Sequence, residues 1–192
     1  MMRKLIIMAA VAACVAGSLA HVSASTLQRL SLNDMILKST AIVQGTIQPG
    51  TTAAMRGPLI YTHYQLSVSA VYKGSAATGQ TVDVAIPGGV LNGMQQPVAG
   101  APMLATGQNY VLFLWTSKSG LTQIIGLSQG LFHVSTNAQG QTIVSRGAAD
   151  ATMLDSGGSV VADSDLQMPL AQLVSAIQST LAGGNASGGS AQ

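Results

Sequence analysis

Glutamate is missing from this sequence of 192 residues, and charge of either sign is scarce. Six aspartates stand against eight lysines and arginines, and only 7% of the residues are charged. General acid–base catalysis usually relies on carboxylates and histidines that converge in a cleft, so this composition disfavours an enzyme. No lysine or arginine lies between Lys73 and Lys118. The chain therefore lacks the basic stripe that nucleic-acid binding requires, and nucleic acid is excluded as a partner.

A basic start followed by an apolar segment predicts a secretory signal peptide. Arg3 and Lys4 precede an apolar stretch from Leu5 to Val15, and small residues follow it. A transmembrane helix needs about 20 apolar residues, so this stretch is too short to span a membrane. Cleavage fits after Ala20 or after Ala24, and we favour Ala24 because it leaves a polar start. The sequence therefore predicts an exported protein, either periplasmic or secreted.

Cysteine is nearly absent as well, and the single Cys14 permits an alternative. Val11-Ala12-Ala13-Cys14 resembles a loose lipobox, in which case Cys14 would carry a lipid and hold the protein on a membrane surface. In a signal peptide, by contrast, Cys14 is only one more apolar residue. The mature chain then has no cysteine, and its stability comes from a hydrophobic core rather than from disulfides. Its net charge is zero, because the six remaining basic residues balance six aspartates.

Apolar residues at helical spacing predict one helix near each end of the mature chain. The first covers Leu30–Ser39, with Ser31 as the N-cap and Asp34 three residues later, as in a capping box. The second begins at Pro169, carries one apolar stripe and ends at Gly183. Its polar face has no lysine or arginine, which favours packing on the domain over binding to a membrane surface.

Between the helices, alternating patterns predict antiparallel strands. The longest alternation runs from Ile60 to Tyr72, with one face apolar and the other polar. Tyr110–Trp115 is apolar on both faces, which predicts a central strand or one covered by a helix. The segment from Pro87 to Asn109 reads as a long irregular loop, and a loop of this length is usually functional. The further predicted strands are 41–47, 82–86, 123–127, 131–135 and 142–145.

Many short strands with glycine-rich turns indicate a small barrel or sandwich. Five main strands between terminal helices favour an OB-like antiparallel barrel of five to seven strands. The sequence therefore predicts a signal peptide over residues 1–24 and a single mainly β domain over 25–182. A short N-terminal helix and a C-terminal helix pack on the barrel, and a disordered tail follows over 183–192.

Three segments, 39–47, 64–74 and 98–114, resemble a group of uncharacterised exported bacterial proteins. More distantly, their layout is similar to netrin-like modules, the OB-type barrels of tissue inhibitors of metalloproteases. The likeness lies in the Lys73-Gly74 turn after a long strand and in Gly107 before the apolar strand. It implies an OB-type fold. The disulfides and the zinc-binding N-terminal cysteine of those modules are missing here, so the resemblance carries no inhibitory site.

Gly126-Leu127-Ser128-Gln129-Gly130 matches the G-x-S-x-G pattern of a nucleophile elbow. Such an elbow needs a helix after the serine, and an acid and then a histidine later in the chain. A strand follows here instead, and His133 precedes every later aspartate. The pattern therefore predicts a turn between two strands.

Other candidate sites also have simpler interpretations. Gly88 and Gly89, with Gly93, could cradle a phosphate, but no lysine or arginine is near, so backbone turns explain them better. His63 and His133 have no second metal ligand at short spacing. The acidic residues Asp150, Asp155, Asp163 and Asp165 could bind calcium in a loop, although their spacing fits no EF-hand. We assign no catalytic, cofactor-binding or metal-binding residue.

The sequence thus favours a non-catalytic exported module that binds a protein or a cell-envelope component. The loop from Pro87 to Asn109 is the predicted contact surface, since loops on a rigid scaffold usually carry such contacts. One alternative is an extracytoplasmic hydrolase built around Ser128 or His133. Another is a structural protein of the envelope that self-assembles through strand edges.

Overall fold

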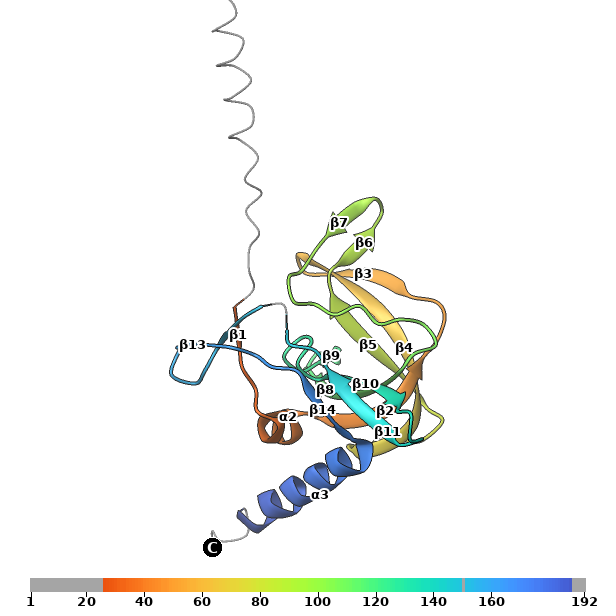
Figure 1. Ribbon diagram of the computed structural model, residues 1–192. Helices are drawn as coiled ribbons and strands as arrows, with labels where there is room; N and C mark the ends of the chain where they lie inside the picture. The colour runs from red at the N-terminus through yellow and green to blue at the C-terminus, as the bar shows by residue number, and fades with distance from the viewer. Residues whose placement is uncertain (1–25, 150, 188–192) are drawn as a thin grey trace, which may run out of the picture.

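The computed structural model describes residues 26–149 and 151–187, and its fold is mainly β with two helices (Figure 1). The predicted signal peptide, its cleavage sites and Cys14 lie outside the described residues, as do Asp150 and residues 188–192. Within the described residues, neither helix is both long and apolar enough to cross a membrane.

One nine-stranded antiparallel sheet forms the centre of the domain. Its strand order is β14 (Leu166–Pro169), β11 (Thr142–Arg146), β10 (Leu131–Thr136), β8 (Asn109–Thr116), β2 (Ala41–Ile47), β4 (Leu59–Lys73) and β3 (Thr52–Arg56). Two further strands branch from this path, since β5 (Thr81–Pro87) pairs with β4 and β9 (Thr122–Ile124) pairs with β8. The seven predicted strands are all present, which confirms the mainly β prediction.

The described strands form no closed barrel. Strands β2, β4, β5, β9 and β8 surround a common core, and β5 approaches β9, but no ladder joins these two strands. Strand β9 is only three residues long, and the turn that follows it leads directly into β10. The closed OB-like barrel that the sequence predicts is therefore not confirmed.

Three segments predicted as loops contain strands. The segment after Pro49 includes β3, which makes a hairpin with β4 through Gly57 and Pro58. The segment from Pro87 to Asn109 includes a second hairpin, formed by β6 (Gly89–Leu91) and β7 (Met94–Gln96). The segment 147–165 includes β12 (Thr152–Leu154) and β13 (Val160–Val161), which join β1 (Thr26–Gln28) in a small sheet.

Two helices cover one face of the central sheet (Figure 1). Helix α2 (Leu32–Lys38) begins with the predicted capping box, in which the Asp34 N–H donates to Ser31 Oγ at 3.0 Å and the Ser31 N–H donates to Asp34 Oδ2 at 3.2 Å. Helix α3 (Leu170–Ser187) starts directly after Pro169. The prediction that Gly183 ends α3 is wrong, because Gly183 keeps a negative φ instead of the left-handed conformation of a C-cap glycine.

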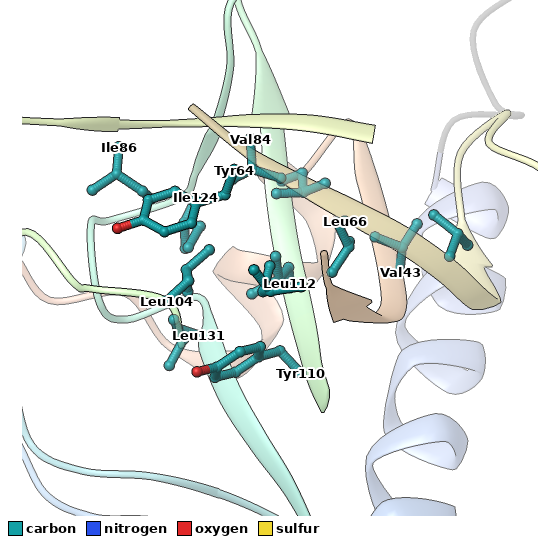
Figure 2. Packing of buried hydrophobic residues seen from close by; sticks show 13 residues of the cluster. Val43, Tyr64, Leu66, Val84, Ile86, Leu104, Tyr110, Leu112, Ile124 and Leu131 are labelled. Carbon is teal, nitrogen blue, oxygen red and sulfur yellow. The ribbon is translucent and has the colours of Figure 1, made fainter. Parts of the chain in front are cut away.

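The central sheet separates two buried clusters, and β8 contributes to both. Tyr110 and Leu112 face one cluster, while Val111 and Phe113 face the other, as predicted for a strand buried on both sides. The helix-side cluster consists of Met35, Ile36, Ile42, Val111, Phe113, Phe132, Val144, Leu173 and Ile177. The hairpin-side cluster, drawn in Figure 2, consists of Val43, Ile47, Tyr64, Leu66, Val68, Val84, Ile86, Leu104, Tyr110, Leu112, Leu114, Ile124 and Leu131.

Candidate functional site

A cavity of about 400 Å³ lies within the segment that the sequence singled out as a contact surface. Thr62 and Tyr64 of β4 form part of its wall, and the hairpin β6–β7 and the loop 97–103 provide most of the rest. The volume falls in the range of about 300–1,000 Å³ that is typical of ligand pockets. Most of the wall is aliphatic or prolyl, with Ile86, Pro87, Val90, Pro97, Val98 and Pro102. All lining residues are uncharged.

Four hydrogen bonds fix the hairpin to strand β4. The Gly88 N–H donates to Ile60 O at 2.7 Å, and Thr62 Oγ1 donates to Gly88 O at 2.8 Å. The Ile60 N–H in turn donates to Gln96 Oε1 at 2.6 Å, and Gln96 Nε2 donates to Pro58 O at 3.1 Å. Because these bonds hold both ends of the hairpin, the cavity is preformed rather than created by a ligand.

Two adjacent glycines make this close attachment possible. Gly88 has a φ of 100° and Gly89 a φ of 137°, values that other residues rarely adopt. A Cβ atom on Gly89 would lie 2.3 Å from Thr62 Oγ1, and one on Gly88 would lie 3.0 Å from Gln96 O. Both glycines therefore serve the path of the backbone, which supports the turn interpretation over a phosphate cradle.

Exposed hydrophobic side chains lie on the hairpin and on the segments next to it. Val90 and Met94 on the two hairpin strands are each 60% exposed, and Met103 on the following loop is 88% exposed. Met55 is also exposed, and its strand β3 contacts β6. Flexible methionine side chains adapt to the shapes of different partners, and exposed apolar groups gathered in one area mark interaction sites. The hairpin side therefore carries several exposed apolar groups in one area.

The structure does not bring Ser128 and His133 together as a catalytic pair. The segment Gly126–Gly130 forms a turn between β9 and β10, as predicted, with Leu127 in the left-handed region at a φ of 58°. Ser128 Oγ is buried and has no hydrogen-bond partner among the described residues. The His133 ring instead packs against the Tyr110 ring, with a centroid separation of 5.0 Å.

A second polar group, on β4 and β5, was not expected from the sequence. His63 Nδ1 lies 2.8 Å from Asp83 Oδ2, and Gln65 Nε2 donates to Asp83 Oδ1 at 3.0 Å. A small cavity of about 290 Å³ lies beside this pair and is also lined by Arg56. Its lining contains no hydroxyl or thiol group. The pair therefore links two neighbouring strands through their side chains.

The described aspartates of the segment 147–165 bond to separate groups. Asp163 makes a bidentate ion pair with Arg146, at 2.9 and 3.0 Å, and both side chains are almost completely buried. Asp165 accepts a bond from the Ala148 N–H, and Asp155 accepts from backbone N–H groups of its own turn. Within the described residues, no group of three or more His, Cys, Asp or Glu side chains could hold a metal ion.

Burial by itself raises the pKa of the Asp163 carboxyl, but hydrogen bonds from Arg146 and from the Ala149 N–H outweigh this effect. The net result is a pKa below the ordinary value of 3.8. Asp163 is therefore ionised at neutral pH and anchors the segment through its charge.

No protein-family model, curated protein or solved structure matches this chain. The similarity to netrin-like modules therefore depends on the three sequence segments alone, and function has to be argued from the site.

Proposed function

We propose that this chain is an exported, non-catalytic module that binds a protein partner on its hairpin side. The observation that carries the proposal is a preformed, uncharged cavity lined by exposed Val90 and Met103, with exposed Met94 on the same hairpin. An OB-like barrel that stays open between β5 and β9 is the proposed scaffold. Hydrophobic groups that are exposed beside a rigid pocket cost stability in water unless a partner covers them. A protein surface with apolar residues is the partner whose chemistry matches this area.

The arrangement of polar groups supports binding over hydrolysis. Acid–base chemistry needs titratable groups within reach of a substrate, and the cavity wall has no charged or imidazole group. Ser128 Oγ, the nucleophile of the hydrolase alternative, is closed off from solvent. Self-assembly through strand edges remains a second use of the same exposed residues, and a mass measurement separates it from binding to another protein.

The test compares two triple variants of the mature chain, residues 25–192. One carries Val90→Ser, Met94→Ser and Met103→Ser. The matched control carries Leu37→Ser, Trp115→Ser and Val160→Ser, which also remove exposed hydrophobic groups but do not line the cavity. Affinity capture from the extracytoplasmic fraction of the host, read by mass spectrometry, should recover a partner with the wild type and the control but not with the hairpin variant.

Equal capture by both variants would contradict the proposal. Sedimentation of the purified chain over a hundred-fold concentration range addresses self-assembly. A mass that rises with concentration and is lost in the hairpin variant would show that the partner is a second copy of this chain.

A further inference from the structure

The hydroxyl group of Tyr64 has no hydrogen-bond partner among the described residues, although most of the side chain is buried. The side chain belongs to the hairpin-side cluster and is only 8% exposed, yet no hydrogen bond joins its Oη atom to any described residue. Two other tyrosine hydroxyls, one partly buried and one buried, are satisfied internally. Tyr72 Oη donates to Gln44 Oε1 at 2.6 Å, and Tyr110 Oη accepts from the Ala105 N–H at 3.0 Å. Tyr64 is therefore the exception among them.

Tyr64 is one of the residues that line the cavity. Among the described residues, the side-chain atoms that lack both a partner and solvent are Ser128 Oγ and Arg146 Nε. Tyr64 Oη is not one of them, so it touches solvent, and the space that Tyr64 lines is the cavity. Figure 2 shows the ring extending beside Ile86 with the hydroxyl at its outer end. An unpaired hydroxyl held at the wall of an apolar pocket is ready to bond to a ligand.

The other polar side chains of the wall are engaged or peripheral. Thr62 Oγ1 and both polar atoms of the Gln96 amide already hold the hairpin in place, and Gln95 is exposed at the rim. A charged ligand group would lose its hydration here without gaining a counter-charge. The occupant should therefore be aliphatic and neutral, with one hydrogen-bonding atom near Tyr64.

Strand β7 gives a reason to expect a peptide. It borders the cavity through Gln95 and Gln96, and its outer edge pairs with no described strand. An extended peptide can add to such an edge through main-chain hydrogen bonds while alternate side chains enter pockets. Its backbone also supplies a carbonyl oxygen beside each side chain.

We propose that the cavity binds an uncharged aliphatic residue of an extended peptide segment, and that Tyr64 Oη donates a hydrogen bond to a carbonyl oxygen next to it. This inference rests on the proposed binding function and specifies the chemistry of the partner. It makes Tyr64 a specificity-determining residue that contributes nothing to internal hydrogen bonding.

The test uses acetylated and amidated pentapeptides Gly-Ser-X-Ser-Gly, with leucine or aspartate at X. They are titrated into the ¹⁵N-labelled mature chain, and binding is followed by the amide shifts of Thr62, Gly89 and Val98. The leucine peptide should give saturable shifts, and the aspartate peptide should bind at least about ten-fold more weakly. Tyr64→Phe should weaken binding of the leucine peptide about five-fold, the usual effect of one neutral hydrogen bond.

Tyr61→Phe is the matched control. It removes the same hydroxyl from the same strand, but at a position that does not line the cavity. Affinity should stay at the wild-type value, and both variants should keep the wild-type melting temperature.

Three results would overturn the inference: no saturable shift with the leucine peptide, equal affinity of Tyr64→Phe and wild type, or an equal loss in Tyr61→Phe. If acetyl-leucine amide binds as tightly as the pentapeptide, the peptide part is wrong and the ligand is a small molecule. After any of these results, the proposed binding function would still be supported if partner capture depends on Val90, Met94 and Met103.

Discussion

The two faces of the central sheet are closed in different ways. On the helix side, α2 and α3 cover a cluster whose nine members are all 0% exposed. On the hairpin side, β4, β5 and a loop that carries Leu104 surround a cluster whose margin is open to the cavity. Helices provide a continuous apolar stripe over a sheet, whereas a loop and a two-stranded hairpin leave gaps.

One polar group on each side illustrates the difference. Lys73 Nζ, beside the helices, donates to the carbonyl oxygens of Ile36 and Leu37 at 2.7 and 3.0 Å, near the C-terminus of α2. Burial lowers the pKa of this amine. On the hairpin side the hydroxyl of Tyr64 is left free. This difference matches the proposed function, in which the helix side carries stability and the hairpin side carries recognition.

The largest expected effect comes from a substitution in the helix-side cluster, which is the better packed of the two. Phe113→Ala should reduce the free energy of unfolding by about 3–5 kcal/mol, because it leaves a cavity in a cluster that cannot collapse easily. Leu104→Ala, on the hairpin side, should cost about 2 kcal/mol, since Leu104 is 6% exposed and borders a region that can relax. Urea unfolding followed by circular dichroism measures both. A larger loss for Leu104→Ala would reverse the division between the two sides.

The next effect concerns the ion pair that anchors the segment 147–165 to strand β11. Arg146→Ala should cost about 3 kcal/mol at pH 7, because it leaves the Asp163 carboxylate buried without its partner. Replacing both residues with hydrophobic ones of similar volume, Arg146→Met with Asp163→Leu, should restore most of the loss. Thermal unfolding at pH 7 distinguishes the two variants, and equal destabilisation would show that the charges contribute more than their packing.

The same pair makes stability depend on pH in one direction. The pKa of Asp163 is lower in the folded state than its ordinary value of 3.8, so the folded state is favoured above pH 3.8. That contribution is lost as the pH falls below 3.8 and through the folded pKa. Unfolding free energies measured between pH 5 and pH 2 should therefore fall less steeply in the Met/Leu double variant than in the wild type.

The hairpin offers a smaller and more local test. Gly89→Ala should cost about 2 kcal/mol, from a backbone conformation that favours glycine and a clash with Thr62. Gly93→Ala is the matched control, with a φ of 79° and open space around it, and should cost about 1 kcal/mol. Amide hydrogen exchange in β6 and β7 should rise more in Gly89→Ala. Equal exchange would mean that the attachment to β4 does not depend on close approach.

Sequence patterns predicted the parts of the fold that depend on neighbouring residues. The capping box at Ser31 and Asp34 and the doubly apolar strand β8 appear as expected. The alternation of β4 holds only in part: Tyr64 packs in the hairpin-side cluster, but Tyr72, predicted on the same face, packs against the helix-side cluster, because register shifts against β2 interrupt the pairing. Hairpin β6–β7 also has a local signal in the sequence, Asn92-Gly93, although the segment was predicted to be irregular. Asn92 and Gly93 both have a positive φ, at 51° and 79°, as in the two-residue type I′ turns that join the two strands of a hairpin.

Contacts between distant segments could not be predicted. The bond between His63 and Asp83 depends on the register of β4 against β5. The sequence does not fix that register, because turns of several lengths could join the two strands. The pairing of Arg146 with Asp163 spans a connector without periodicity. The sequence also cannot show which tyrosine hydroxyl stays unpaired, because Tyr72 and Tyr110 gain their hydrogen bonds only through tertiary packing. Loop length drew attention to the segment that lines the cavity, but the chemistry of the cavity could not be predicted.

The smallest expected effect is the most direct test of the division between the two sides. Tyr72→Phe should cost about 1 kcal/mol, because Gln44 Oε1 loses its donor in a partly buried position. Tyr64→Phe removes the same group from the hairpin side and should change stability by no more than about 0.3 kcal/mol, since no internal bond is lost. Urea unfolding of the two variants in parallel resolves this difference. A clear loss of stability in Tyr64→Phe would mean that its hydroxyl supports the fold and is not held free for a partner.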